Sequence, residues 1–271
     1  MSIVVTGKSS MIGQQLQRHA ATGSWLFLSH EEALQDESWQ NDCSCLINLA
    51  FSPTLRLEGY DPKNDIDNHL AHSIRETHSH FIMMSSRTVY GPAPAPDYRL
   101  TEDIAPSPQT AYAKNKLRIE QTLADHLGGD RVTVIRGANV FGHETGRRSF
   151  FGMALSRLKE KGEIYFDMNP DVRRDFLAVW HVADALVTIA QDPKPGLYNL
   201  GSGFATRCGD VANWIIEGYG SGSIQSGSLE YKDAFYMDMK KSRAAYNIPV
   251  ITPEILKADC LSCGKALKDS P

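Results

Sequence analysis

A short apolar run near the start of the chain, Ile3-Val4-Val5, passes directly into the turn Thr6-Gly7-Lys8-Ser9-Ser10-Met11-Ile12-Gly13. Residues 12–19 have helical character, so Gly7 and Gly13 bracket a strand-to-helix turn. The backbone N–H groups of such a turn can face a pyrophosphate, and the helix N-terminus favours negative charge. An ordinary β–α turn has the same outline, and Ser10 stands where a middle glycine is usual. The turn alone therefore leaves both interpretations open.

Strands and helices continue to alternate over the first half of the chain. Apolar runs predict strands at residues 25–28, 45–50, 81–85 and 132–136, and helices are expected over 70–76 and from 113 to about 126. This alternation predicts an α/β fold with a Rossmann-type, doubly wound parallel sheet. We expect residues 1–140 to form a dinucleotide-binding Rossmann domain.

The pattern becomes irregular after residue 140. Helices are expected over 149–161 and 181–191, and short strands at 164–166 and 198–200. We expect residues 141–271 to form mainly a small C-terminal substrate lobe, with some elements returning to the main sheet.

Composition excludes several classes of protein. The net charge of −4 gives no reason to expect nucleic acid or an anionic membrane as a partner. No apolar run approaches the roughly 20 residues that a membrane helix needs. Met1 leads straight into a strand, so no signal peptide is expected and a cytoplasmic location is predicted.

The five cysteines are an odd number, which argues against a secreted disulfide framework. Cys260-Leu261-Ser262-Cys263 has the spacing of a metal or redox motif, but no second Cys or His pair follows it. A structural role is the favoured interpretation, and no metal is predicted.

Tyr112 and Lys116 are the first candidates for catalysis, because they lie one helical turn apart and face the same way. A free tyrosine is protonated at neutral pH, and a nearby ammonium favours its phenolate. Tyr112 could then move a proton on or off a sugar hydroxyl while a nicotinamide takes or gives hydride. Ser86, which follows the predicted strand at 81–85, would hydrogen-bond the reacting oxygen. The alternative is an ordinary surface Tyr and Lys on a helix.

Seven segments in this order resemble one family, the extended short-chain dehydrogenases/reductases. This group comprises the NAD-dependent nucleotide-sugar epimerases, dehydratases and reductases. The similar segments are Thr6–Gly13, Asn48-Leu49-Ala50, Ser85–Gly91, the pair Tyr112 and Lys116, Arg136–Gly142, Arg174–Asp184 and Tyr198–Gly203. Seven ordered matches are far more specific than any single one.

The resemblance implies a site. NAD or NADP would be held by Gly7, Lys8, Ser9, Ser10, Met11, Ile12, Gly13, Asn48, Leu49, Ala50, Ser85, Tyr112 and Lys116. The catalytic residues would be Ser86, Tyr112 and Lys116, and a nucleotide-sugar substrate would be bound by Ser86, Asn139 and Arg174. Arg174 would pair with the diphosphate, because a guanidinium donates parallel hydrogen bonds; a salt bridge to a neighbour such as Asp175 is the alternative. The resemblance also implies a possible homodimer and a role in polysaccharide biosynthesis.

The chain departs from the family pattern in three places. Arg87 and Thr88 stand where 4,6-dehydratases carry an Asp-Glu pair, which argues against water elimination. Only residues 29–44 lie between two predicted strands, where the family usually fits more sheet, and Ser29 and His30 replace the acidic residue expected at the adenosine ribose. Lys8 would favour NADP if it approached a 2′-phosphate, although an exposed turn lysine explains it equally well.

The third departure is the short chain, which resembles dTDP-4-dehydrorhamnose-reductase-like proteins. The favoured function is therefore an NAD(P)-dependent nucleotide-sugar epimerase or 4-keto reductase, an isomerase or oxidoreductase. Two alternatives stay open: a dinucleotide-sensing binding protein without catalysis, and a reductase of a non-nucleotide carbonyl.

Overall fold

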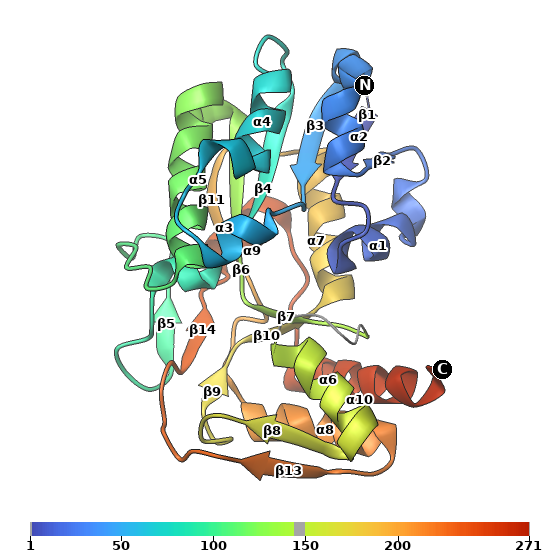
Figure 1. Cartoon of the computed structure of the whole chain (residues 1–271), viewed down its shortest axis with the longest axis vertical. Coiled ribbons are helices and arrows are strands. Elements are labelled where there is room, and N and C mark those ends of the chain that lie inside the picture. The colour runs from blue at the N-terminus through green and yellow to red at the C-terminus, as the bar shows by residue number, and fades with distance from the viewer. Residues whose placement is uncertain (1, 144–149, 271) are drawn as a thin grey trace.

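A six-stranded parallel sheet forms the centre of the molecule (Figure 1). The computed structural model describes residues 2–143 and 150–270. The strands run in the order β2 (Leu26–Leu28), β1 (Ser2–Thr6), β3 (Cys43–Asn48), β4 (His80–Ser86), β6 (Val132–Gly137) and β11 (Gly196–Leu200), and every pairing is parallel. The predicted doubly wound sheet is confirmed. The chain moves outward from β1 to β2 and then returns to place β3 on the other side of β1, so a crevice is expected at the carboxyl ends of β1 and β3.

The sheet is buried on both faces, as the continuous apolar strands require. Successive side chains of a strand point to opposite faces, and the two hydrophobic cores of the protein reflect this alternation. One core contains Val4, Leu46, Phe81 and Val134, and the other contains Val5, Ile47, Ile82 and Ile135. The strands are thereby fixed in register, and so are the residues at their carboxyl ends.

Helices cover the two faces in separate layers (Figure 1). One layer holds α2 (His30–Gln35), α3 (Pro53–Leu57), α4 (Ile66–Ser73) and α5 (Ala111–Leu127), and the other holds α1 (Met11–Gln17), α7 (Val179–Gln191) and α9 (Lys240–Tyr246). Helix α5 begins two residues before the expected start, because the Thr110 side chain accepts a hydrogen bond from Ala113 N. Tyr112 therefore lies in the first turn of this helix and not in the preceding loop.

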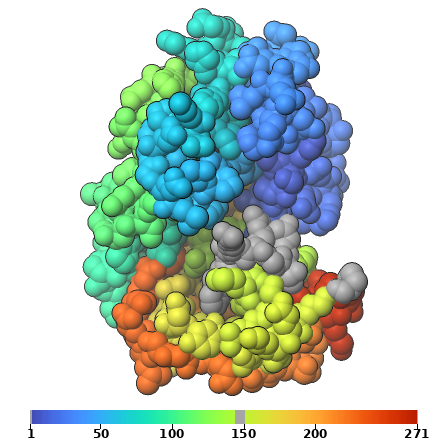
Figure 2. Space-filling view, in the orientation of Figure 1, coloured from blue at the N-terminus to red at the C-terminus, as the bar shows by residue number. Residues whose placement is uncertain are grey.

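The second half of the chain contributes to both parts of the molecule. Helix α7 and strand β11 belong to the layered sheet, whereas α6 (Phe150–Lys161), β8 (Glu163–Phe166), α8 (Cys208–Tyr219), β13 (Ser223–Ser226) and α10 (Pro253–Asp269) pack together below it (Figure 1). Ser149, the expected start of α6, lies outside the described residues. Figure 2 shows the face on which the blue-to-green half and the yellow-to-red half of the chain meet.

Short strand pairs join these two parts. They are β7 (Asn139–Phe141) with β10 (Phe176–Ala178), β9 (Arg173–Arg174) with β12 (Thr206–Arg207), and β5 (Tyr98–Leu100) with β14 (Phe235–Met237). Asn139 and Arg174 both lie on these connecting strands. The candidate substrate residues are thus held at the junction between the sheet and the lower elements.

Among the described residues, no helix combines the length and apolarity that crossing a membrane requires. All five cysteines are free and buried, and on α10 the Cys263 thiol donates to the Gly142 carbonyl. Burial raises the pKa of Cys263 to about 12, so this thiol is an inert packing group.

Candidate active site

The glycine turn packs tightly on the end of β3. Gly7 has φ 80°, and a Cβ at this position would lie 2.7 Å from Ala50 N. A Cβ at Gly13 would lie 2.5 Å from the carbonyl oxygen of Gly7. Both glycines are therefore required by backbone contacts. Ser10, the departure from the usual glycine pattern, caps α1 by accepting a hydrogen bond from Gly13 N at 3.0 Å, so its side chain supports the turn.

Asn48 ties the ends of β1 and β3 together. Its Oδ1 accepts hydrogen bonds from the Thr6 hydroxyl at 2.8 Å and from Ala50 N at 2.9 Å. These two donors fix the orientation of the amide, so its Nδ2 points at Asp67 and donates to that carboxylate at 2.7 Å. The crevice at the strand order reversal thus has a rigid, fully connected floor.

Lys116 and Ser86 lie at the carboxyl end of β4. Lys116 is buried, with 4% of its surface exposed, and its Nζ donates to the carbonyl of Met84 at 2.8 Å and lies 4.3 Å from the Phe51 ring centroid. Ser86, two residues beyond Met84 on the same strand, accepts hydrogen bonds from the backbone N and the hydroxyl of Thr88 at 3.2 and 3.0 Å. The structure therefore brings two of the three predicted catalytic residues to one strand end.

Tyr112 reaches the same region from the first turn of α5. Its ring meets Phe51 edge-on at 5.2 Å, and the Arg56 guanidinium lies 4.9 Å from its centroid. Helix α3, which carries Arg56, is held against α5 because Asn115 Nδ2 donates to the carbonyls of Leu55 and Glu58. Phe51 therefore touches both Tyr112 and Lys116 and links these two predicted catalytic residues.

A buried ion pair fixes α5 relative to the sheet. Glu120, on the same face of α5 as Lys116, accepts hydrogen bonds from Arg136 at 3.1 and 2.6 Å and from the Ser85 hydroxyl. The side chains of Arg136 and Glu120 are 3% and 8% exposed. Ser85, assigned to the cofactor from the sequence, thus serves to lock β4 onto α5.

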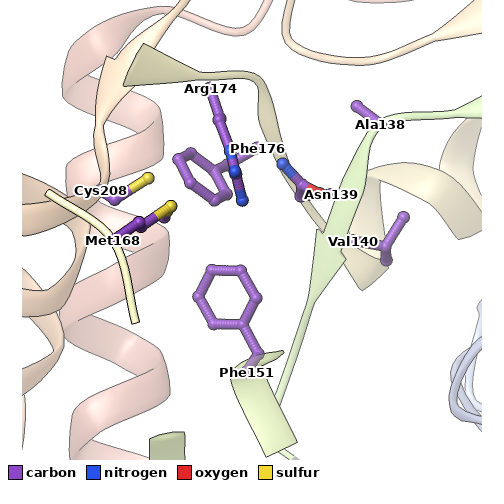
Figure 3. Close-up of a pocket in the computed structure, with 8 residues that line it drawn as sticks. All are labelled: Ala138, Asn139, Val140, Phe151, Met168, Arg174, Phe176 and Cys208. Atoms are coloured by element: carbon purple, nitrogen blue, oxygen red, sulfur yellow. The ribbon is translucent and has the colours of Figure 1, made fainter. Parts of the chain in front are cut away.

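Asn139 and Arg174 line one cavity of about 200 Å³ (Figure 3). Arg174 extends into it beside Phe176, and Phe151 lies on the opposite side (Figure 3). The remaining lining residues are Ala138, Val140, Met168 and Cys208. A cavity lined mostly by apolar side chains, with one guanidinium and one amide, suits a ligand that has an aromatic part and an anionic part.

The salt bridge considered for Arg174 is made with Asp233 and not with Asp175. Arg174 Nη2 lies 3.6 Å from Asp233 Oδ2, and its Nε donates to the Asp233 carbonyl at 3.1 Å. Asp175 instead accepts hydrogen bonds from the backbone N of Ser202, Gly203 and Met237 and from the Ser202 hydroxyl. Burial raises the pKa of Asp175 to about 6, although these four donors oppose the change. Asp175 therefore organises the Gly201–Gly203 loop.

The crevice has the features that a nicotinamide dinucleotide needs. The glycine turn leaves no room for side chains between the ends of β1 and β3, which lets a pyrophosphate approach the backbone. Among the described residues, the Lys116 ammonium makes one hydrogen bond, to Met84, so two of its N–H groups remain for ribose hydroxyls. These residues fit the group, which would supply the hydride.

The end of β2 carries no acidic residue, but the nearby residue Glu32 places a carboxylate beside the glycine turn. Glu32 lies in the first turn of α2, where a reciprocal capping box with Ser29 directs its carboxylate back toward the turn. Both Glu32 oxygens accept hydrogen bonds from Lys8 Nζ, at 2.7 and 2.6 Å. Hydrogen bonds from Lys8 and from Ser29 N hold the pKa of Glu32 below its usual range. Lys8 is therefore engaged by a carboxylate.

This ion pair leads to a prediction about cofactor preference. We expect Glu32→Gln to shift preference from NAD toward NADP by about tenfold, because Gln keeps the capping box but releases Lys8 for a 2′-phosphate. Fluorescence titration of NADH and NADPH measures the ratio of dissociation constants. Glu31→Gln, on the same helical turn, is the matched control. An unchanged ratio in Glu32→Gln would remove Glu32 and Lys8 from cofactor selection.

Buried Asp67 gives a prediction about pH. Burial raises its pKa to about 6, against the opposing effect of Lys116. The folded state therefore binds this proton more tightly than the unfolded state does. Protonated Asp67 stabilises the fold, and this contribution to the unfolding free energy is present below pH 4 and is lost as the pH rises through 6. The change amounts to as much as about 3 kcal/mol. In urea denaturation, the unfolding free energy should fall less between pH 4 and 7 for Asp67→Asn than for wild type. Asp125→Asn, at an exposed position, should behave like wild type. The same pH dependence in wild type and both variants would contradict this prediction.

Several site residues escaped the sequence analysis. The spacing Ser29-x-x-Glu32 is a capping-box signal and could have identified Glu32. Glu120 follows Lys116 by four residues, so helical periodicity places it on the same face. Asp233 carries no such signal, because it comes from a distant loop.

The chain is similar to known proteins in sequence and in fold. The sequence profile of the NAD dependent epimerase/dehydratase family matches residues 3–201. GDP-6-deoxy-D-mannose reductase of Pseudomonas aeruginosa is 28% identical over 235 residues, which are 74% of this chain and 74% of that protein.

Solved structures share the fold. UDP-glucuronic acid 4-epimerase from Bacillus cereus, in complex with UDP-glucuronic acid and NAD, superposes with a TM-score of 0.78 at 17% identity over 99% of both chains. RMD from Pseudomonas aeruginosa, complexed with NADPH, gives a TM-score of 0.74 at 20% identity, also over 99% of both chains.

Proposed function

Because the chain belongs to the NAD-dependent epimerase/dehydratase family, we propose that it transfers hydride between NAD or NADP and a carbon of a nucleotide-activated sugar. It would act in the cytoplasm as a 4-epimerase or a 4-keto reductase. The observation that carries the proposal is the placement of Lys116 and Ser86 at the end of β4, with Tyr112 bridged to Lys116 by Phe51.

Each residue has one role in this proposal. Tyr112 moves the proton of the reacting sugar hydroxyl, and Ser86 orients that oxygen by a hydrogen bond. Lys116 holds the ribose of the cofactor and supplies a positive charge beside Tyr112. Asn139 and Arg174 bind the nucleotide part in the cavity between β7 and β9, so that the sugar reaches the strand end.

Water elimination is not part of the proposal. Arg87 and Thr88 occupy the positions of the dehydratase acids, and Arg87 is engaged in a bidentate ion pair with Asp233. No carboxylic acid is therefore offered by these two positions to protonate a departing hydroxyl.

The proposal also assigns different roles to the two halves of the chain. Residues 1–140 would bind the dinucleotide and carry the catalytic residues, and residues 141–271 would mainly bind substrate. A homodimer would form through α5 and a neighbouring helix, as the family resemblance implies.

Nucleoside diphosphate binding tests the substrate class. We expect Arg174→Ala to weaken the binding of nucleoside diphosphates about 10- to 100-fold in calorimetric titrations, because a charged hydrogen bond to phosphate is lost. Arg173→Ala is the matched control, since Arg173 is the adjacent residue of β9 and pairs with Asp97. Wild-type protein without affinity for any nucleoside diphosphate would instead favour a non-nucleotide carbonyl substrate.

A further inference from the structure

Two arginines converge on one carboxylate beside the cavity. Arg87 donates from Nη1 to Asp233 Oδ1 at 2.7 Å and from Nη2 to Oδ2 at 2.5 Å. Ala93 N adds a hydrogen bond to Oδ1 at 3.1 Å. Arg174 reaches the same carboxylate from the cavity, with its Nη2 at 3.6 Å from Oδ2. This arrangement of donors around an oxyanion is the one a bound anion requires.

We propose that Arg87 and Arg174 form a two-guanidinium site for the diphosphate of the substrate, and that Asp233 is an internal anion which competes with this ligand. The inference rests on the proposed function and adds two residues to it. Arg87 becomes a second anion-binding residue, and Asp233 becomes the group that the ligand must displace from Arg174.

The balance of charge favours a ligand with more than one negative charge. Two guanidiniums face one carboxylate, so Arg87, Arg174 and Asp233 together carry one surplus positive charge. Asp175, next to Arg174, is turned toward Ser202, Gly203 and Met237 and does not neutralise it. A diphosphate that displaced Asp233 would match both cations.

Arg87 is prepared for such a ligand. Its guanidinium lies 4.2 Å from the Phe235 ring centroid, and its side chain is 11% exposed. Its Nε is buried and has no acceptor among the described residues, although a buried donor is normally paired. Because Arg87 directly follows Ser86, an anion bound here would lie close to the reacting sugar.

Asp233 contacts the two arginines unequally. Its backbone lies in the left-handed region, with φ 58°, which is uncommon outside glycine and tolerated best by Asn and Asp. Its contact with Arg174 is longer than its contact with Arg87. Displacement would therefore begin at Arg174, the residue that lines the cavity.

Titration with inorganic pyrophosphate tests the proposal directly. We expect Asp233→Asn to bind pyrophosphate about tenfold more tightly than wild type, since the competing charge is gone while Asn retains the left-handed backbone. The gain should disappear in Asp233→Asn combined with Arg174→Ala, and also when Asp233→Asn is combined with Arg87→Met. Glu230→Gln, a nearby carboxylate paired with Lys232, controls for net charge and should give no gain.

The outcomes separate this proposal from the proposed function. Equal or weaker pyrophosphate binding in Asp233→Asn, a gain that survives loss of Arg174, or the same gain in Glu230→Gln would each overturn it. If Asp233→Asn does not fold, the wild-type protein is titrated with pyrophosphate and its arginine Nε–Hε NMR signals are followed. The signals of Arg87 and Arg174 should both shift, and stationary signals would refute the site. Pyrophosphate lacks a base and sugar, so an absence of nucleoside diphosphate binding would refute the proposed function while leaving this test intact.

Discussion

Tyr112→Phe is expected to lower turnover of a nucleotide sugar by about 10²- to 10⁴-fold, the usual contribution of a positioned acid–base group. The substitution removes the hydroxyl that moves the proton, but it keeps the ring that packs against Phe51 and Arg56. The fold and the dinucleotide binding should therefore persist. Turnover is measured by NMR of the sugar anomeric signals for an epimerase, or by absorbance of the reduced nicotinamide for a reductase.

The control is Tyr165→Phe, which removes a hydroxyl from an exposed tyrosine on β8. It should leave turnover unchanged. Full activity in Tyr112→Phe would show that another group carries the proton, and the proposed mechanism would then be wrong. Loss of dinucleotide binding together with activity would assign Tyr112 to cofactor binding alone.

Glu120→Leu should lower the unfolding free energy by about 3–5 kcal/mol, because it leaves Arg136 as an uncompensated buried charge. Combining it with Arg136→Met should recover much of this loss, since two apolar side chains can replace a buried pair at little cost. Urea denaturation followed by circular dichroism measures both changes. Glu160→Leu, an exposed position on α6, should change stability by less than about 0.5 kcal/mol.

The same variants test whether the ion pair also positions the catalytic helix. Lys116 and Glu120 share one face of α5, and Ser85 and Ser86 are adjacent on β4. If the double variant regains stability but not turnover, the pair holds α5 at the correct distance from β4. If Glu120→Leu is as stable as wild type, the buried ion pair does not fix α5 relative to the sheet.

The sheet could be predicted because its strands follow simple rules. Val4 and Val5, or Phe81 and Ile82, enter opposite cores, so each strand is a continuous apolar run that stands out in the sequence. The strand-to-helix turn could also be predicted, because Gly7 and Gly13 bracket it directly after an apolar run, although the Ala50 contact that requires glycine at position 7 is seen only in the structure. These features depend on local sequence.

The lower elements and the charge pairs depend on contacts between distant residues. Helices α8 and α10 cross so closely that a Cβ at Gly218 would lie 2.2 Å from the Leu261 carbonyl oxygen, and nothing near Gly218 in the sequence indicates its partner. Arg87 and Asp233 are 146 positions apart. The sequence could identify Arg174 as a candidate anion-binding residue, but only the tertiary fold shows that its carboxylate partner is Asp233.

Identification of the dinucleotide that the protein carries or binds tests the central claim most directly. The purified protein is denatured, any released nucleotide is identified by mass spectrometry, and protein without bound nucleotide is titrated with NADH and NADPH. The account predicts a nicotinamide dinucleotide: retained NAD would indicate an epimerase, which returns the hydride it removes, and exchangeable NADPH would indicate a keto-sugar reductase. A protein that neither releases nor binds a dinucleotide would contradict the account.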